Sequence, residues 1–347
     1  MSEEQSEYTG ILTSEGWLCM RCGTRRADHS PDCPEFTRRK LGFVAMLRIK
    51  DEARWIREVL ESILPLCEHV FVMDDHSTDE TVSICESFPQ VTVFRSPFVG
   101  MNEARDKNWL YDRITAECEA QWILCIDGDE VLEKSGPQII RETCGNASAS
   151  QNAFSLQIAF IWDNLNTVRT DRIYRDFWRP SIFRPFYDTP GVPDSRTILS
   201  ELRFMSTPFG RVVGNNKPNL HCSSVPQRFI HGRGLCPARL KHYGYLHRQD
   251  RVRKLDFYTS IDWKNAAEDC YRHMCQGDSP RLDEMPRIQQ KIAEGTLSMA
   301  DVDFLTNVSA ESRLVHAGPM KLEPWNEDVP WPISDWARQQ HTPPVAA

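Results

Sequence analysis

The sequence lacks the features that take a chain into or across a membrane. It has no run of about 18 consecutive apolar residues, so we expect no membrane-spanning helix. Its first residues, MSEEQSEYTG, are acidic and polar and do not have the basic start and apolar centre of a signal peptide. These two absences predict a cytoplasmic protein.

The sequence also lacks an excess of positive charge, internal repeats and low-complexity tracts. Its net charge of −8 argues weakly against a general nucleic-acid binder, although local basic patches remain possible. Its 40% of hydrophobic residues are enough for a sizeable core. Its 347 residues exceed one typical domain and favour one large α/β domain with appendages.

Cysteine is the residue type that the chain has in excess, with 12 copies. Without a secretory signal we expect no disulfide framework. Four cysteines lie in apolar stretches and are expected to be buried as small hydrophobic side chains: Cys67, Cys85, Cys118 and Cys125.

One cysteine cluster has the spacing of a metal site. The polar segment 1–39 carries Cys19, Cys22, His29 and Cys33 within 15 residues. These side chains suit tetrahedral Zn²⁺, and metal binding would supply the folding free energy that so short a segment lacks. We therefore predict a structural zinc, with free thiols on a flexible arm as the alternative.

The middle of the chain alternates apolar runs with amphipathic stretches. Runs of strand length at 42–49, 69–75, 91–96 and 121–130 suit strands that are buried on both faces. Between them, period-3.6 patterns predict helices after Asp51 and Glu52, after Ser77 or Thr78 as the N-cap, and over 102–119. The alternation predicts a parallel sheet with right-handed crossovers.

Two of the predicted strands end in acidic clusters. Asp74 and Asp75 follow VFVM, and Asp127-Gly128-Asp129-Glu130 follows WILCI. Ligands bind outside the carboxyl ends of strands in such sheets, and grouped carboxylates need a compensating cation. Mn²⁺ or Mg²⁺ supplies it, because both prefer oxygen ligands. The alternative is that both clusters are solvated acidic turns. Because both are predicted at the same edge of the sheet, a shared metal-binding site is favoured.

Four motifs in this order carry a family resemblance: VAMLRIKDEARWIREVLES, VFVMDDHSTDET, NEARDKNW and WILCIDGDE. They resemble the nucleotide-sugar-binding half of GT-A, family-2-like glycosyltransferases. The resemblance implies a GT-A (Rossmann-like) α/β fold with a mostly parallel sheet flanked by helices. It places a donor half at 42–135 and an acceptor half at 136–250 of a domain over 40–250, followed by a helical extension and a Pro/Trp-rich tail over 251–347.

The resemblance also implies roles for residues on the donor side. Asp75, with Asp74 beside it, would contact the base or ribose of the nucleotide, while Leu47 and Arg48 would form the wall of the base pocket. Lys107 and Asn108 match a basic-Asn pair that lies near the donor. Many family members have Asn-Glu where this chain has Asp51 and Glu52, so a polar contact from position 51 is open.

Further roles concern the metal. The resemblance implies that Asp129 contacts the metal directly and that Asp127 faces the ribose or a metal-bound water. His242, in LKHYGY, would complete the metal shell or touch the diphosphate, with His221 as second choice and a purely structural histidine as the alternative.

The activity implied is sugar transfer from a nucleotide-sugar donor to an acceptor hydroxyl. If the anomeric centre is inverted, a carboxylate must deprotonate that hydroxyl. Asp194 is our candidate base, with Asp188 and Glu201 as alternatives.

Two basic stretches bear on the phosphates and on the acceptor. Residues 228–254 contain eight Lys or Arg and one acid and are expected to form a positive rim near phosphates, or a solvated helix face. Residues 169–186 mix arginines with aromatics, which suits an acceptor surface or an ordinary domain edge. The acceptor could be a glycan, a lipid precursor, a hydroxylated DNA base or a protein.

Two other functions stay open. A nucleotidyltransferase would also use paired carboxylates, but it should have a Gly-rich, Lys-bearing loop after its first strand, and LRIKDEAR has no glycine. A non-catalytic nucleotide-sugar-binding module is disfavoured because the acids at Asp75, Asp127 and Asp129 are intact.

Overall fold

A computed structural model describes most of the middle of the chain and parts of its ends. The described residues are 10–13, 16–19, 39–148, 151–171, 174–185, 203–204, 222–226, 234–261, 294–296, 320–335 and 337–338. Several predicted site residues lie outside them: Cys22, His29, Cys33, Asp188, Asp194, His221 and Glu201. Of Cys19 only the backbone is described, at the end of β2 (Gly16–Cys19), which pairs with β1 (Gly10–Thr13).

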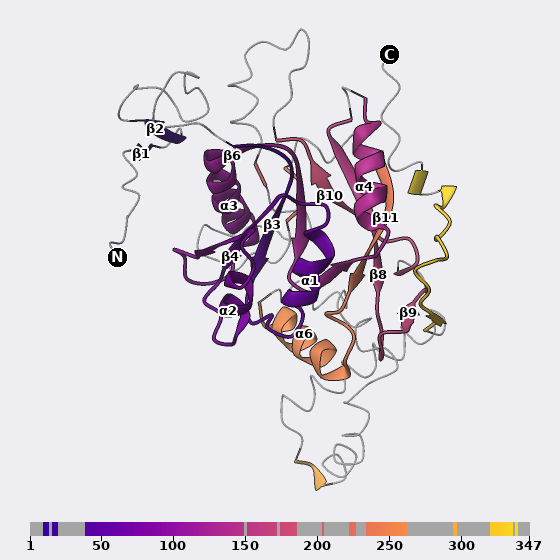
Figure 1. Ribbon diagram of the computed structural model, residues 1–347. Coiled ribbons are helices and arrows are strands. Elements are labelled where there is room, and N and C mark those ends of the chain that lie inside the picture. The colour runs from indigo at the N-terminus through magenta and orange to yellow at the C-terminus, as the bar shows by residue number, and fades with distance from the viewer. Residues whose placement is uncertain are drawn as a thin grey trace, which may run out of the picture.

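An eight-stranded mixed sheet forms the centre of the described residues, in the order β5-β4-β3-β6-β10-β8-β11-β7 (Figure 1). The strands of its first half are β3 (Arg39–Ile49), β4 (His69–Asp74), β5 (Val91–Arg95) and β6 (Cys118–Asp127). Those of its second half are β7 (Glu130–Leu132), β8 (Ala153–Phe160), β10 (Trp178–Phe183) and β11 (Gly234–His242).

The first half of the sheet confirms the strands predicted from the apolar runs. β3 pairs in parallel with β4 and with β6, and β4 pairs in parallel with β5. The second half differs from the mostly parallel sheet that we expected. There β10 is antiparallel to both β6 and β8, and β11 is parallel to β8 but antiparallel to β7. The fold is therefore a mixed α/β sheet in which β5, β4, β3 and β6 form a parallel part.

Helices cover both faces of the parallel half because its strands carry apolar side chains on both sides. Ala45, Leu47 and Ile49 pack in one cluster with α1 (Ile56–Ile63) and α4 (Gly136–Gly145). Their neighbours Val44 and Met46 pack in a second cluster with α3 (Glu103–Glu117). Successive side chains thus alternate between the α1 face and the α3 face.

The second helix, α2 (Thr81–Glu86), begins later than predicted. Its N-cap position is Glu80, whose side chain makes no capping hydrogen bond, so the prediction of Ser77 or Thr78 as the cap is wrong. The Ser77 hydroxyl instead accepts from the Asp51 amide at 2.9 Å. The Asp51 carboxylate in turn accepts from the Thr78 amide at 2.7 Å. These two residues tie the loop after β4 to the loop after β3, so the strand ends are fixed to each other.

The C-terminal segment packs against the same core as the sheet. β12 (Leu322–Pro324) pairs with β9 (Thr167–Arg169), and Trp325 and Trp331 lie against the main hydrophobic cluster. The Arg239 guanidinium lies over the Trp325 ring and donates to the backbone oxygens of Val329 and Glu327. The long described helix of the expected extension over 251–347 is α6 (Arg248–Ile261), which begins before it, while 320–331 is strand, turn and irregular chain.

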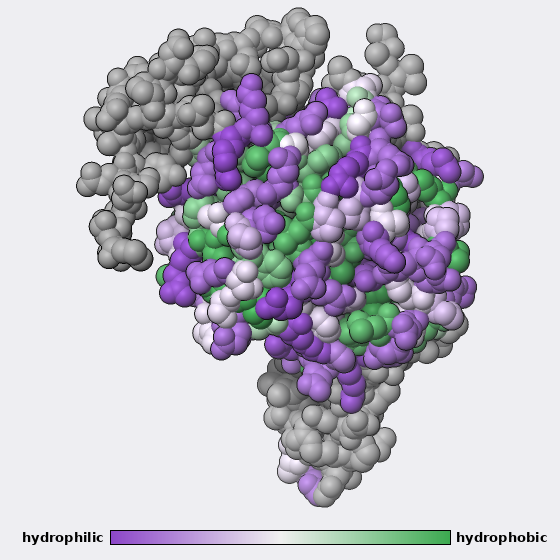
Figure 2. All heavy atoms as spheres, in the orientation of Figure 1, coloured by the Kyte–Doolittle hydropathy of each residue, from purple (hydrophilic) through white to green (hydrophobic). Residues whose placement is uncertain are grey.

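None of the described helices is both long and apolar enough to cross a bilayer. The face drawn in Figure 2 is mainly hydrophilic, with hydrophobic side chains in separate areas between the polar ones. The buried thiols predicted from sequence are confirmed, since Cys67, Cys85, Cys118 and Cys125 are all buried.

The buried pair of Arg239 and Glu133 gives a stability prediction. Both side chains are almost fully buried, and Arg239 Nε lies 2.7 Å from Glu133 Oε2. Arg239→Ala leaves that carboxylate buried without its partner and should lower the free energy of unfolding by about 3–5 kcal/mol. Arg203→Ala is the control, because Arg203 pairs with Asp112 at the surface; it should cost about 1 kcal/mol or less. If urea unfolding shows that Arg239→Ala and Arg203→Ala lower the free energy of unfolding equally, the prediction is wrong.

His69, at the start of β4, gives a pH prediction. Burial, and to a smaller degree Arg39, lowers the pKa of His69 to about 4. The unfolded chain therefore binds the proton at higher pH, and stability is lost as pH falls from 6.5 towards 4. Between pH 7 and pH 5, wild type should lose about 2 kcal/mol more than His69→Gln.

Urea unfolding at several pH values measures this difference. His76→Asn, in the exposed loop after β4, is the control and should keep the wild-type pH dependence. If His69→Gln loses as much stability between pH 7 and pH 5 as wild type does, His69 is not the source of that loss.

Candidate functional site

The acidic ends of β4 and β6 lie on either side of β3, at one edge of the sheet. In the register of the parallel strands, Arg48 is paired with Asp127 and Ile49 with Asp74. The Asp75 amide donates to the Ile49 oxygen at 2.8 Å. Two strand spacings, about 10 Å, therefore separate the two acidic strand ends. The carboxyl edge carries both predicted clusters.

Asp75 faces an arginine that also reaches α3. Arg48 Nη2 lies 2.5 Å from Asp75 Oδ2, and Arg48 Nε lies 2.8 Å from Asp106 Oδ2. The side chain of Asp74 is fully buried, and its Oδ1 accepts from the Ser77 amide at 3.0 Å. Arg48 and Asp75 are thus at the edge, whereas Asp74 shapes the turn behind it.

The other predicted donor-side residues lie deeper in the fold. The Leu47 side chain is fully buried in the core cluster under α1. Lys107 is buried and pairs with Glu103 at 2.5 Å. Asn108 exchanges two hydrogen bonds of 2.9 Å with the backbone of Phe204. The structure therefore does not bring the Leu47 or Asn108 side chain to the acidic edge.

Asp127 is paired with an arginine from the second half of the sheet. Arg179 Nη1, on β10, donates to Asp127 Oδ2 at 2.9 Å, and Arg179 also contacts Glu130. Burial opposes ionisation of Asp127, but Arg179, Lys107 and His242 together outweigh it and keep the pKa of Asp127 below its usual value. The Asp127 side chain is still 42% exposed, so it is open to a ligand.

Glu130 is the buried member of this group. Its Oε2 accepts from the Asp127 amide at 2.9 Å, while Oε1 has no hydrogen-bond partner among the residues that the structure describes. Burial raises the pKa of Glu130 to about 7, against the lowering effect of Arg179. Glu130 therefore holds the turn after β6 and orients Arg179.

Asp129 faces away from β10, towards α6 and the end of β11. Lys254 Nζ, on α6, lies 2.9 Å from Asp129 Oδ2. The contact is close enough that a Cβ on Gly244 would lie 2.0 Å from Lys254 Nζ and 2.2 Å from Asp129 Oδ2. Burial opposes ionisation of Asp129, but His242 and Lys254 keep the pKa of Asp129 below its usual value.

His242 lies beside Asp129 in an aromatic stack. Its ring stacks on Tyr245 at 4.9 Å and on Phe160 at 5.5 Å, and burial lowers the pKa of His242 to about 4. Its Nδ1 accepts from the Gly244 amide at 3.1 Å. A neutral imidazole that accepts at Nδ1 carries its proton on Nε2, the atom that faces Asp129 Oδ1 at 3.9 Å. Coordination of a metal by Nε2 therefore requires the other tautomer and the loss of that hydrogen bond.

Glu52 is a further carboxyl group at this edge. A Cβ on Gly128 would lie 2.8 Å from Glu52 Cγ, so the side chain packs against the turn between Asp127 and Asp129. Burial, and then the charge of Asp129, raises the pKa of Glu52 to about 8. Glu52 is thus mainly protonated near neutral pH and adds little negative charge.

The acidic turn fits a cation that is shared with a ligand, not one enclosed by protein. Within the described part of the chain, no three His, Cys, Asp or Glu side chains form a ready-made metal site. Mg²⁺ and Mn²⁺ are commonly bound by one or two carboxylates together with phosphates and water. Asp127 and Asp129 supply such oxygens, and Asp127 is open to solvent.

Arg179 and Lys254 were signalled only weakly in the sequence, as members of the two basic stretches, and no pattern placed either beside the acidic turn. Arg179 comes from an antiparallel strand 52 residues later, and Lys254 from a helix 125 residues later. Other members of the predicted basic and aromatic stretches are structural. Arg169, for example, is buried over the rings of Trp162 and Tyr174.

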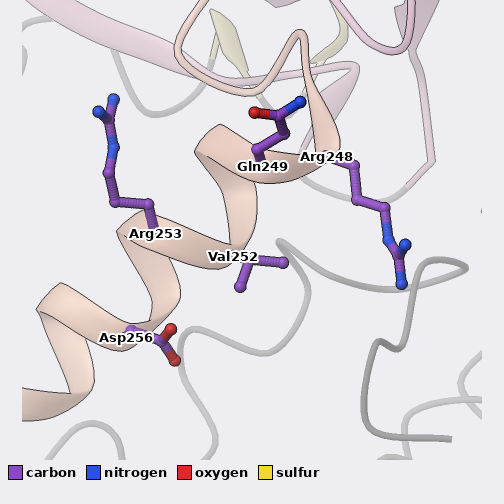
Figure 3. A pocket seen from close by; sticks show the side chains of 5 residues that line it. All are labelled: Arg248, Gln249, Val252, Arg253 and Asp256. Atoms are coloured by element: carbon purple, nitrogen blue, oxygen red, sulfur yellow. The ribbon is translucent and has the colours of Figure 1, made fainter. Parts of the chain in front are cut away.

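A hollow of about 420 Å³ lies on the side of α6 away from this cluster (Figure 3). Its described lining residues are Arg248, Gln249, Val252, Arg253 and Asp256. At about 100° per residue, these side chains leave the helix roughly opposite to Lys254. The hollow therefore lies mainly on another side of α6 than Lys254, while the charge of its lining residue Arg253 still acts on Glu52.

Comparison with known proteins identifies the segment that contains the acidic edge. Residues 48–143 match the glycosyl transferase family 2. An uncharacterized glycosyltransferase of Rickettsia bellii (strain RML369-C) is 30% identical over 144 residues, 41% of this chain and 42% of that protein. One of Rickettsia felis (strain ATCC VR-1525 / URRWXCal2) is 26% identical over 226 residues, 64% of this chain and 69% of that protein. The match thus spans less than half of the first relative.

Solved structures with similar chains include the 1-349 fragment of S. aureus TarS, which is 13% identical. It aligns over 72% of this chain and 78% of its own, with a TM-score of 0.35. Glucosyl-3-phosphoglycerate synthase from Mycobacterium tuberculosis, in complex with Mn²⁺, UDP and glucosyl-3-phosphoglycerate, is 18% identical. It aligns over 35% of this chain and 44% of its own, with a TM-score of 0.27.

The family match covers Arg48, Asp75, Asp127 and Asp129, the residues that carried the resemblance seen in the motifs. That resemblance is confirmed: residues 48–143 of this chain are a glycosyl transferase family 2 region.

Proposed function

We propose that this protein is a glycosyltransferase that moves a sugar from a nucleotide-sugar donor to an acceptor hydroxyl. The observation that carries the proposal is the paired acidic edge within the family 2 region. There Asp127 and Asp129 leave one turn beside β3, and each faces a cation. This edge is also where parallel α/β sheets bind ligands.

The donor would lie along the edge from the end of β4 to the end of β6. Asp75 and Arg48 are suited to the nucleoside, because the Asp75 carboxylate accepts hydrogen bonds and is held by Arg48 at 2.5 Å. Asp127 and Asp129, about 10 Å away, are suited to the diphosphate end. Each end of the donor would then have its own recognition group.

The chemistry needs positive charge where the diphosphate leaves. A divalent cation held by Asp127 and Asp129 would stabilise the charge that develops on the leaving group. Arg179 and Lys254 add two permanent positive charges at the same turn. The N–H of neutral His242 points to the same place and can donate to a phosphate oxygen.

The transfer itself replaces one bond by another at the anomeric carbon. The acceptor oxygen forms a bond to that carbon, the bond from the carbon to the phosphate oxygen breaks, and the nucleoside diphosphate leaves. A carboxylate takes the proton of the acceptor hydroxyl in an inverting reaction. Asp194 is our candidate, with Asp188 and Glu201 as alternatives. The acceptor is a glycan, a lipid precursor, a protein or a hydroxylated DNA base.

A thermal-shift screen tests the proposal. UDP, GDP, CDP and their sugars are each added with and without Mn²⁺. One nucleotide class should raise the melting temperature much more with metal than without it. A ligand at a hundred times its Kd adds about 2.7 kcal/mol of stability. Asp129→Ala should remove this response, whereas Asp328→Asn, at an exposed turn, should keep it. The absence of a metal-dependent response to every nucleotide would refute the proposal.

The two ends of the donor can be separated by a second variant. Asp75→Asn removes the carboxylate that faces the nucleoside but leaves the turn at Asp127 and Asp129 intact. Calorimetry should find weaker binding of the nucleoside monophosphate by about 1–2 kcal/mol, with or without metal. Asp129→Ala should leave that binding unchanged. If Asp75→Asn weakens only metal-dependent binding, Asp75 does not have the assigned role.

A further inference from the structure

Lys254 places its positive charge next to the carboxylate of Asp129, which is the best candidate for binding a metal. Its Nζ lies 2.9 Å from Asp129 Oδ2 and 5.2 Å from the centre of the Tyr245 ring. Both partners are shielded, because the side chain of Lys254 is 23% exposed and that of Asp129 is 8% exposed. The shielding makes this charge pair stronger than one at an open surface.

The helix that carries Lys254 is anchored on both sides of it. Arg251 is buried, donates to the Tyr245 oxygen at 2.8 Å and pairs with Asp163 at 3.0 Å. Asp250, one turn before Lys254, pairs with Arg54 at 3.0 Å, and Leu255, directly after Lys254, is buried in the core. Figure 1 shows α6 crossing the lower end of the sheet, below α1. These contacts fix the backbone of α6, so Lys254 is held at Asp129 by the fold.

The acidic turn is therefore already neutralised by the chain itself. Arg179 faces Asp127 at 2.9 Å, and Lys254 faces Asp129 at 2.9 Å. In this turn the two carboxylates of Asp127 and Asp129 already face the two cations Arg179 and Lys254. A divalent cation that binds alone adds two positive charges, which Arg179 and Lys254 repel at this distance. A divalent cation that arrives with a diphosphate brings its own negative charge and avoids that penalty.

We propose that Lys254 suppresses the binding of free divalent metal at Asp127 and Asp129 and thereby couples metal binding to the binding of the donor diphosphate. The inference rests on the proposed function, since it assumes a diphosphate donor. When donor and metal are both bound, the Lys254 ammonium is released from Asp129 and is available to the phosphate oxygens. Lys254 is thus a positioning residue that sets the order in which the site fills.

The test measures Mn²⁺ binding to the full chain without any nucleotide, by the electron paramagnetic resonance signal of free Mn²⁺. Lys254→Gln removes the charge and should bind Mn²⁺ about tenfold tighter than wild type, or more. Lys254→Arg keeps the charge and should bind as weakly as wild type. Lys40→Gln is the matched control, because Lys40 is exposed at the start of β3, at the end of that strand away from the acidic edge; it should leave the affinity unchanged.

The same titration with a nucleoside diphosphate measures the coupling. The nucleotide identified by the thermal-shift screen should tighten Mn²⁺ binding by a larger factor in wild type than in Lys254→Gln. Within each protein, Mn²⁺ should tighten nucleotide binding by the same factor by which the nucleotide tightens Mn²⁺ binding. This readout is an equilibrium ratio, which a general loss of stability in the variant does not imitate.

Two results overturn the inference. One is equal affinity of wild type and Lys254→Gln for free Mn²⁺. The other is a gain in affinity that persists when Asp129→Asn is added to Lys254→Gln, because the extra metal then lies elsewhere. If either occurs while wild type still binds nucleotide and Mn²⁺ together through Asp129, the inference fails and the proposed function stands. If no nucleotide binds with metal at all, both fail.

Discussion

Two aspartates on one three-residue turn repel each other, and the arrangement of this site follows from how that repulsion is offset. Gly128 lets the turn after β6 lie against Glu52, which leaves the carboxylates of Asp127 and Asp129 facing different partners. Arg179 lies on one side and Lys254 on the other. Raised pKa values reduce the further negative charge that Glu52 and Glu130 add. The turn is stable because its cations come from the fold.

Both cations belong to the part of the chain beyond the family 2 match. β10 lies next to β6 and brings in Arg179, while α6 follows β11 and brings in Lys254. His242 lies at the end of β11, where its backbone pairs with Glu130. The second half of the sheet therefore completes the electrostatics of the first half. A glycosyl transferase family 2 region that ended at residue 143 would contain the carboxylates without their partners.

The sequence predicted the features that local pattern determines. Buried parallel strands appear as continuous apolar runs, so β3 to β6 were found, and strand ends share an edge, so Asp75 and Asp127 were placed together. Arg179 and Lys254 could not be placed, because their contacts depend on the order of strands beyond β6, which no local pattern determines. The N-cap of α2 was misplaced because Ser77 bonds to the loop after β3, a tertiary contact that outweighs local preference.

The contacts of Arg239 with Trp325, Glu327 and Val329 have a consequence for how the chain folds as it leaves the ribosome. Its guanidinium accompanies β11 into the core, yet the backbone oxygens that it binds, those of Glu327 and Val329, follow 88 and 90 residues later. β9 likewise gains its partner β12 only after about 150 further residues. During synthesis β9 therefore stays without its strand partner β12 until the 320s emerge, and a pause before that point leaves β9 open to chaperones and to pairing with other chains.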